Sequence, residues 1–123
     1  RLLTVKPFDR GSIGAIEKAI QAGNLGVNPA SDGMMIRIQI PELTEDSRKD
    51  LGKQASTIAE EGKIAVRKVR QEANDALKKE QKDGDITEDD FHGDKDAVQK
   101  LTDRFCDQID KIVADKQSEI MEL

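Results

Sequence analysis

The chain has 123 residues, of which 37% are charged and only 2% are aromatic, and its formal net charge is −5. A core without Trp or Tyr must be built mainly from Leu, Ile, Val and Ala, which favours long helices over a β-sandwich. The acidic balance argues against a wholly basic nucleic-acid binder, although one face can still be basic. The single cysteine cannot form an internal disulfide, which favours a reducing compartment. No apolar run approaches the ~20 residues that span a membrane.

Residues 1–40 are predicted to form part of a small α/β domain, arranged as a β-α-β unit. The first strand covers residues 2–5 and ends before a proline, and the second covers residues 34–40, with three isoleucines on one face. Between them, apolar residues at helical spacing predict one short helix. Residues 28–33 are rich in Asn, Pro, Ser, Asp and Gly, so they are predicted to be turns.

A short joint and a helical domain over residues 44–123 are predicted to follow. The hinge residues are Pro41, Glu42 and Leu43. Thr44 is placed to cap a helix that runs to about residue 82 without a proline. Thr87 is placed to cap a second helix over residues 87–122, and the short acidic loop between the helices predicts an antiparallel pair. Apolar stripes as wide as those on these helices usually require a third helix.

The first long helix sorts its polar residues into two sectors beside its apolar stripe. One sector, which we call the basic ridge, consists of Arg48, Lys49, Lys53, Lys63, Arg67, Arg70 and Asn74. Acidic residues fall mostly on the other sector, so the ridge is suited to contact with a phosphate backbone. The alternative interpretation is a solvated charged face without a ligand.

Candidate metal and catalytic residues do not assemble into a site. Residues 83–85 begin like a calcium loop, but Glu88 stands where that loop needs glycine and Asp94 stands where it needs a bidentate Glu. His92 has no second ligand nearby. Cys106 has no histidine at helical spacing, which favours a partly buried apolar side chain over a nucleophile. We therefore expect a protein that is not an enzyme and that needs no metal or cofactor.

Short motifs along the whole chain resemble the ribosome recycling factor family. In chain order they are VKPFDR (5–10), AIEKAI (15–20), NLGVNP (24–29), IR (36–37), PELTE (41–45), RKDL (48–51), AVRKVR (65–70) and VQKLTD (98–103). Each motif is weak alone, but their order and spacing make the resemblance specific. It places the chain in the C-terminal two-thirds of the family's length, without the first helix and the opening strands of the small domain. Gly62 and the run Phe91-His92-Gly93 depart from the family, because both favour a helix less than the usual residues.

The resemblance implies an α+β fold with an L shape, in which a three-helix bundle is joined by the hinge to the small α/β domain. It also implies a function: binding to the post-termination ribosome and, with elongation factor G, dissociation into subunits and release of mRNA and tRNA. The positions that the family uses on large-subunit ribosomal RNA match Arg48, Lys49, Arg67 and Arg70, which makes the basic ridge the expected RNA-binding surface.

Two other function classes and more than one location stay open. A helical coiled-coil interaction module without RNA binding would carry the same apolar stripes, and an enzyme would have to use Cys106. Salt dependence separates the first alternative from RNA binding, and alkylation of the cysteine tests the second. The expected partners include neither a membrane nor DNA. The expected location is the bacterial cytoplasm, with the chloroplast stroma or mitochondrial matrix as alternatives.

Overall fold

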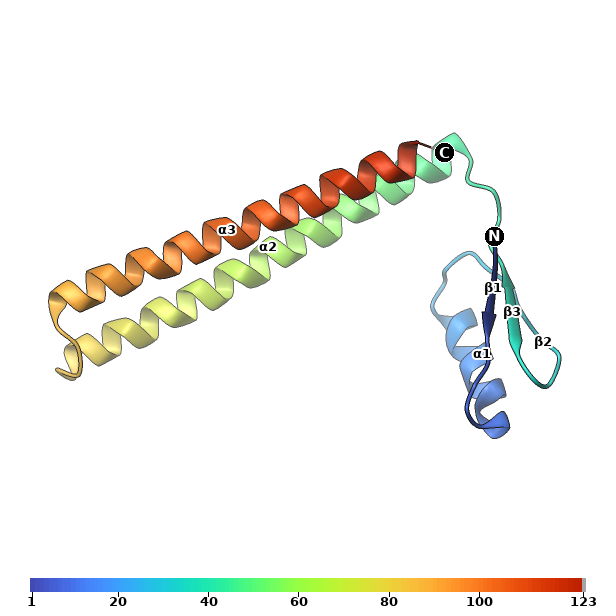
Figure 1. The fold of residues 1–123 in the computed structure, drawn as a ribbon, viewed down its shortest axis with the longest axis horizontal. Coiled ribbons are helices and arrows are strands. Elements are labelled where there is room, and N and C mark those ends of the chain that lie inside the picture. Colours follow the sequence, from blue (N-terminus) through green and yellow to red (C-terminus); the bar gives the residue numbers. More distant parts are fainter. Residues whose placement is uncertain (123) are drawn as a thin grey trace. The chain divides into compact units, whose positions relative to one another are not determined.

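The computed structural model describes residues 1–122, which form an α+β protein as predicted. The elements in chain order are β1 (Leu2–Val5), the 3-10 helix η1 (Arg10–Ser12), α1 (Ile13–Ala22), β2 (Pro29–Ser31), β3 (Ile36–Gln39), α2 (Glu45–Lys82) and α3 (Glu88–Met121) (Figure 1). The chain divides into two compact units, Arg1–Leu43 and Thr44–Leu123, which we call the small unit and the helical unit.

The small unit is built on a three-stranded antiparallel sheet in the order β1-β3-β2, so β3 is the central strand. Val5 pairs with Ile36 and Leu3 pairs with Ile38 across the β1–β3 ladder. Ile13 of α1 packs with Ile36 and Ile38 to form the buried core. A core of three buried isoleucines agrees with the low apolar content of this segment and limits the free energy of burial available to the unit.

The strand β2 corrects the sequence prediction. Its three residues lie inside the segment 28–33 that was predicted as turns, and they pair antiparallel with β3. Pro29 is the first residue of this edge strand, a position at which a residue without an N–H is tolerated. The prediction of a two-stranded β-α-β unit is therefore wrong. A strand this short carries almost no periodic signal, and its pairing with β3 comes from tertiary context.

Strand β3 begins at Ile36, two residues later than predicted, because a turn centred on Asp32 precedes it. The Oδ1 atom of Asp32 accepts hydrogen bonds from the backbone N–H groups of Met34 and Met35, both at 3.0 Å. These two hydrogen bonds, of which the one from Met35 has the larger effect, hold the pKa of the Asp32 carboxyl below its usual 3.8. The guanidinium of Arg37 lowers this pKa further. The turn is therefore held by a carboxylate that is charged at neutral pH.

The helical unit consists of α2 and α3, which run antiparallel (Figure 1). Thr44 caps α2, since its Oγ1 accepts a hydrogen bond from the N–H of Ser47 at 3.1 Å. Thr87 and Asp90 form a capping box at the start of α3, with N···O distances of 3.0 and 3.3 Å. Gly84, with φ of +81°, lies in the turn between the helices, where a residue without Cβ avoids strain.

Two helices alone leave much of the apolar stripes uncovered. Within the described part of the helical unit, only Ala59 and Thr102 are buried. Ile58 and Ile112 are each 67% exposed. The pairing of α2 with α3 therefore uses one edge of each stripe and leaves the other edge open to solvent.

Candidate nucleic-acid interface

The basic ridge divides into two groups when α3 is packed against α2. The residues whose side chains lie partly buried are Arg48, Lys63, Arg70 and Asn74. The exposed ones are Lys49, Lys53 and Arg67. All seven positions come from α2, so helix periodicity places them on one broad face, while the neighbouring helix decides how much of each remains accessible.

Arg48 and Arg70 reach toward α3 and bond to it. The Nη1 atom of Arg48 donates a hydrogen bond to the backbone carbonyl oxygen of Ile120 at 2.8 Å. The Nη1 atom of Arg70 donates to Oε1 of Gln99 at 3.4 Å. Each guanidinium has further N–H donors, so these contacts orient the fork and leave donors for an external phosphate.

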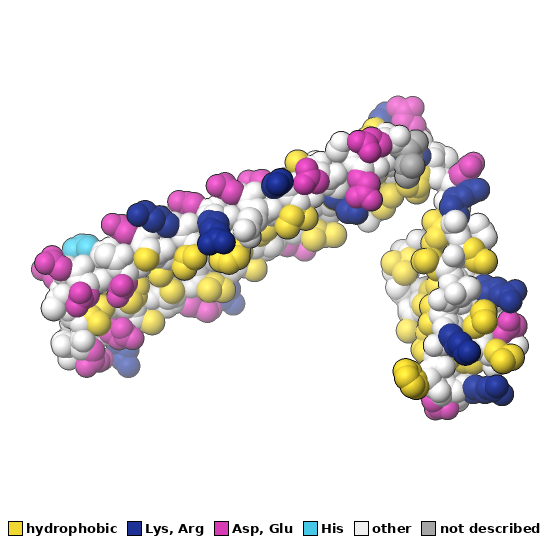
Figure 2. Space-filling model, viewed as in Figure 1, with side chains coloured by type: hydrophobic (Ala, Val, Ile, Leu, Met, Phe, Trp, Pro, Cys, Tyr) yellow, Lys and Arg dark blue, Asp and Glu magenta, His cyan; other side chains and the backbone are white. Residues whose placement is uncertain are grey.

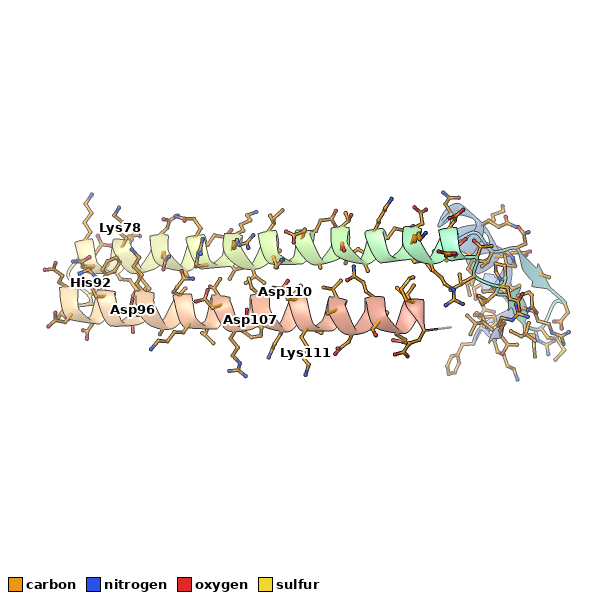
Figure 3. The ribbon with its side chains drawn as sticks, turned by 90° about the horizontal axis from the view of Figure 1, so that it is seen from above. Lys78, His92, Asp96, Asp107, Asp110 and Lys111 are labelled. Atoms are coloured by element: carbon orange, nitrogen blue, oxygen red, sulfur yellow. The ribbon has the colours of Figure 1, made fainter. Side chains whose placement is uncertain are left out.

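Lys63 is largely enclosed, with a side chain only 15% exposed. Its Nζ atom donates to Oε1 of Glu60 at 2.8 Å and to Oδ1 of Asp110 at 2.9 Å. Figure 3 shows Asp110 on the side of α3 that faces α2, whereas Lys111 points away. Glu60 and then Asp110 raise the pKa of Lys63 above its usual 10.5. Lys63 therefore stays charged, but its charge is neutralised within the helical unit.

Lys53 and Arg67 are the exposed cations with the least internal compensation. Neither forms an ion pair within 4.0 Å among residues 1–122. Lys49 pairs with Glu45 of the same helix at 3.1 Å, but both side chains are largely exposed and such a pair is weak. Arg67 combines free charge with a planar fork, so it is the ridge residue best suited to hold a phosphate.

Asn74 continues the ridge toward the loop end of α2. Its Oδ1 atom is enclosed and has no hydrogen-bond partner among the described residues. An enclosed amide oxygen without a partner costs free energy, and because it is enclosed it is not available to a ligand at the surface. The structure thus places Asn74 beside the ridge cations without exposing its acceptor.

Helix α3 carries basic residues outside the predicted RNA-binding set. Lys100, Arg104 and Lys111 line a shallow depression on α3 together with Asp103 and Asp107. The spacing of four and seven residues between the cations is a signal that helix periodicity could have found. The interleaved carboxylates offset much of the positive charge, so this surface suits a phosphate backbone less well than the exposed part of the ridge.

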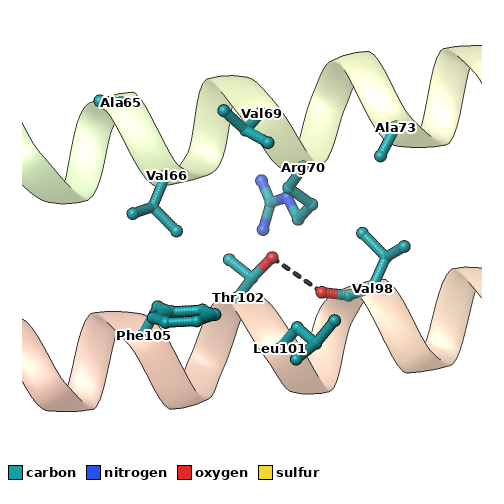
Figure 4. Close-up of a pocket in the computed structure, with 9 residues that line it drawn as sticks. All are labelled: Ala65, Val66, Val69, Arg70, Ala73, Val98, Leu101, Thr102 and Phe105. Atoms are coloured by element: carbon teal, nitrogen blue, oxygen red, sulfur yellow. Dashed lines mark hydrogen bonds between the residues drawn. The ribbon is translucent and has the colours of Figure 1, made fainter.

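A long apolar groove runs along the two helices, and Figure 2 shows hydrophobic side chains following them. One segment, of about 410 Å³, is lined by Ala65, Val66, Val69, Arg70, Ala73, Val98, Leu101, Thr102 and Phe105 (Figure 4). A second segment, of about 380 Å³, is lined by Ala55, Ile58, Ala59, Gly62, Ile109, Ile112, Val113 and Lys116. We call the two segments together the apolar groove. Contiguous exposed apolar surface of this kind marks a packing or interaction face.

The predicted hinge residues and Cys106 lie outside the basic ridge and the apolar groove. Pro41, Glu42 and Leu43 lie between β3 and α2, outside any helix or strand, and Glu42 forms an exposed ion pair with Arg1 at 3.6 Å. Cys106 is a half-buried free thiol. Within residues 1–122, no group of three or more His, Cys, Asp or Glu side chains could hold a metal ion. None of the helices in that range has the length and apolar character needed to cross a membrane.

Residues 1–121 match a family model described as ribosome recycling factor. The ribosome-recycling factor of Staphylococcus saprophyticus is 54% identical over 121 residues, which are 98% of this chain and 66% of the relative. That of Bacillus subtilis is 54% identical over 123 residues, which are 100% of this chain and 66% of the relative. The chain thus spans just under two thirds of the length of these relatives.

Solved structures agree with the sequence matches. A solution structure of the ribosome recycling factor matches with a TM-score of 0.68 and 37% identity, covering 99% of this chain and 64% of that chain. A second match has a TM-score of 0.57 and 40% identity, covering 98% of this chain and 65% of that chain. It comes from models for the T. thermophilus ribosome recycling factor and the E. coli elongation factor G bound to the E. coli post-termination complex.

Proposed function

Because the chain belongs to the ribosome recycling factor family, we propose that it acts in ribosome recycling after termination of translation. In this proposal it binds the post-termination ribosome and, with elongation factor G, promotes separation of the subunits and release of mRNA and tRNA. The observation that carries the proposal is the 54% identity to named ribosome-recycling factors over the whole chain. A relative with the same fold has been placed on a post-termination complex together with elongation factor G, which supports both partners.

The surface proposed to meet large-subunit ribosomal RNA is the exposed part of the basic ridge. Ribosomal RNA helices are A-form, so a protein helix reaches them through phosphates and 2′-hydroxyls more than through base edges. Arg67 and Lys53 present uncompensated charge there, and Arg48 and Arg70 keep guanidinium donors at the edge of the same face. The neutralised Lys63 contributes mainly to holding α2 and α3 together.

The apolar groove is proposed to receive the third helix of the bundle that the family fold implies. Val69 and Leu101 are 64% and 50% exposed in the groove, and an amphipathic helix would cover both. The relatives are longer than this chain by about half its length, which supports a segment of theirs as the source of that helix. A filled groove would make the helical unit a rigid body, which a mechanical role between two ribosomal subunits requires.

The proposed mechanism contains no catalytic step on this chain. Binding energy would favour one arrangement of the subunits, while GTP hydrolysis on elongation factor G would supply the drive. Pro41, Glu42 and Leu43 would act as a hinge, since the backbone there belongs to no helix or strand. The family and its bacterial relatives support a role as a translation factor in the bacterial cytoplasm.

Co-sedimentation with ribosomes tests the proposal. We expect the chain to pellet with 70S ribosomes and isolated large subunits, and log affinity to fall linearly with log salt. An interaction module without RNA binding would lack this steep salt dependence. Alkylation of Cys106 should leave binding intact, because the thiol is half-buried and takes no part in the proposed contacts. Absence of ribosome binding at low salt would refute the proposed function.

A further inference from the structure

The loop between β1 and η1 carries an aromatic ring that nothing in the small unit covers. Phe8 has a relative exposure of 113%, and the next most exposed large hydrophobic residue of this unit, Leu25, has 70%. Aromatic side chains usually bury most of their area, so a ring left open on both faces is unusual. A protein with only three phenylalanines and no Trp or Tyr displays one of them completely.

The backbone beneath this ring is held in one conformation. Pro7 is half-buried and fixes its own φ. The Oδ1 atom of Asp9 accepts a hydrogen bond from the N–H of Gly11 at 3.0 Å, and its carbonyl oxygen accepts from Oγ of Ser12 at 2.7 Å. A Cβ at Gly11 would lie 3.2 Å from the Asp9 carboxylate, which shows how closely the loop closes on itself. The ring is therefore presented by a pre-organised loop, which lowers the entropy lost on binding.

Two cations flank Phe8 in the sequence, and neither forms an ion pair among the described residues. Lys6 and Arg10 are exposed and form no ion pair within 4.0 Å among residues 1–122. The nearest acid in sequence, Asp9, uses its carboxylate on the N–H of Gly11. Residues 1–43 carry five Lys or Arg and four Asp or Glu, a net charge of +1, while the whole chain is at −5. The small unit thus has a net positive charge although the whole chain is acidic, and it includes the loop that carries Phe8.

We propose that Lys6, Phe8 and Arg10 form a stacking site for an unpaired nucleotide of RNA, a second RNA contact that lies on the small unit. A flat ring with both faces open accepts a stacked base, and cations two residues away on either side can reach the neighbouring phosphates. An acidic peptide would satisfy the cations but would gain little from the open faces of the ring. The proposal rests on the proposed ribosomal function and extends it to unpaired RNA.

A tryptophan probe tests the site directly. The chain contains no Trp or Tyr, so the Phe8→Trp variant carries one tryptophan whose fluorescence reports on this position alone. Titration with single-stranded oligoadenylate should quench it, and the same strand paired with oligouridylate should quench it much less, because only unpaired bases stack on a side chain. Phe8→Ala should weaken binding of labelled oligoadenylate about tenfold, and Phe8→Leu should resemble Phe8→Ala.

The controls separate this site from a general apolar surface and from the basic ridge. Leu25→Ala removes another exposed apolar side chain of the small unit and should leave oligoadenylate binding unchanged. Lys6→Gln with Arg10→Gln should weaken binding and reduce its salt slope by about two charges. Circular dichroism should be the same for all variants, because the side chains of Lys6, Phe8 and Arg10 are exposed.

Two results would overturn the proposal. The first is a Phe8→Trp variant whose fluorescence oligoadenylate does not change, and it would do so even if Phe8→Ala lost ribosome binding, because the ring would then act without stacking on an unpaired base. The second is equal affinity for oligoadenylate before and after Phe8→Ala. If oligoadenylate quenches the probe but the parent chain fails to bind ribosomes, the stacking site stands and the proposed function fails.

Discussion

The Nζ atom of Lys63 in α2 lies 2.9 Å from Oδ1 of Asp110 in α3, 47 residues further along the chain. This contact crosses the seam between the two long helices, where the Lys63 side chain is largely enclosed. It removes one cation from the basic ridge and leaves Arg67, which has no such partner among the described residues, as the principal exposed arginine.

We therefore predict a loss of ribosome binding at one ridge position, Arg67, and almost no change at its neighbour on the same face, Lys63. Arg67→Gln should weaken ribosome binding by about 1–3 kcal/mol and lower the salt slope by about one charge, because an arginine–phosphate contact is lost. The double variant Lys63→Gln with Asp110→Asn removes one positive and one negative charge, so ribosome affinity should hardly change. Co-sedimentation at two salt concentrations measures both. Equal losses in the two variants would contradict the assignment of Lys63 to helix pairing.

Arg70 should show the difference between a guanidinium and an ammonium. Its fork is oriented by Gln99, and its stem lines the apolar groove. Arg70→Ala should weaken ribosome binding by about 1–3 kcal/mol, and Arg70→Lys should restore only part, because charge is kept and the fork is lost. Lys68→Ala is the control on the same helix and should matter much less. Binding that falls for Lys68→Ala and not for Arg70→Ala would show that the RNA-facing side of α2 is elsewhere.

The open apolar groove should be detectable with a dye that binds exposed apolar surface. Ile112→Glu places a negative charge in one of the two groove segments, which opposes the anionic dye, so it should lower binding of anilinonaphthalene sulfonate to the chain by roughly half. Ile64→Glu is the matched control for the added charge, since Ile64 is 61% exposed but lines neither segment. Both exposed substitutions should change the free energy of unfolding by no more than about 0.5 kcal/mol. Equal dye binding by the parent and Ile112→Glu would mean that the groove is closed in solution.

Two of the three glycines inside the long helices should reduce stability, since no close contact requires a residue without Cβ there. Gly93→Ala should raise the free energy of unfolding by about 1 kcal/mol, because a Cβ there meets nothing within 4 Å. Gly62→Ala should give a similar gain, since its Cβ would lie at an ordinary 3.5 Å from Cδ1 of Ile109. Gly84→Ala should destabilise by about 1–2 kcal/mol, because φ is +81° there. Urea denaturation compares the three, and a gain at Gly84 would contradict the left-handed conformation.

The turn at Asp32 should make the small unit sensitive to acid. The folded pKa of Asp32 lies below the usual 3.8, so its carboxylate stabilises the fold above that value and loses the effect as pH falls through the folded pKa. Asp32→Asn keeps the side-chain shape without the charge, so it should abolish this part of the acid dependence. NMR titration of the carboxyl group and thermal unfolding at several acid pH values measure the effect. An unchanged acid profile in Asp32→Asn would show that the turn does not depend on the charge.

Local sequence was sufficient for the parts of the fold whose partners are close in the chain. Thr44 and Thr87 bond to backbone N–H groups three residues ahead, so their capping roles follow from residue type and spacing alone. The 3.6-residue period likewise puts the ridge residues on one face of α2. The motifs in residues 5–10 and 65–70, among others, are local in sequence and are sufficient to indicate the family.

Tertiary structure decided what the local pattern leaves open. Strand β2 forms because Pro29, Ala30 and Ser31 pair with the edge of β3. Three residues carry too little periodicity for the sequence to predict that pairing. The antiparallel register of α2 and α3 brings Asp110 to Lys63, so a cation that looks available on a helical wheel is neutralised in the fold. The full exposure of Phe8 is likewise set by the tertiary structure and does not follow from the sequence. A side chain's accessibility depends on every segment that packs near it, whereas its place on a helix or strand depends only on its neighbours in sequence.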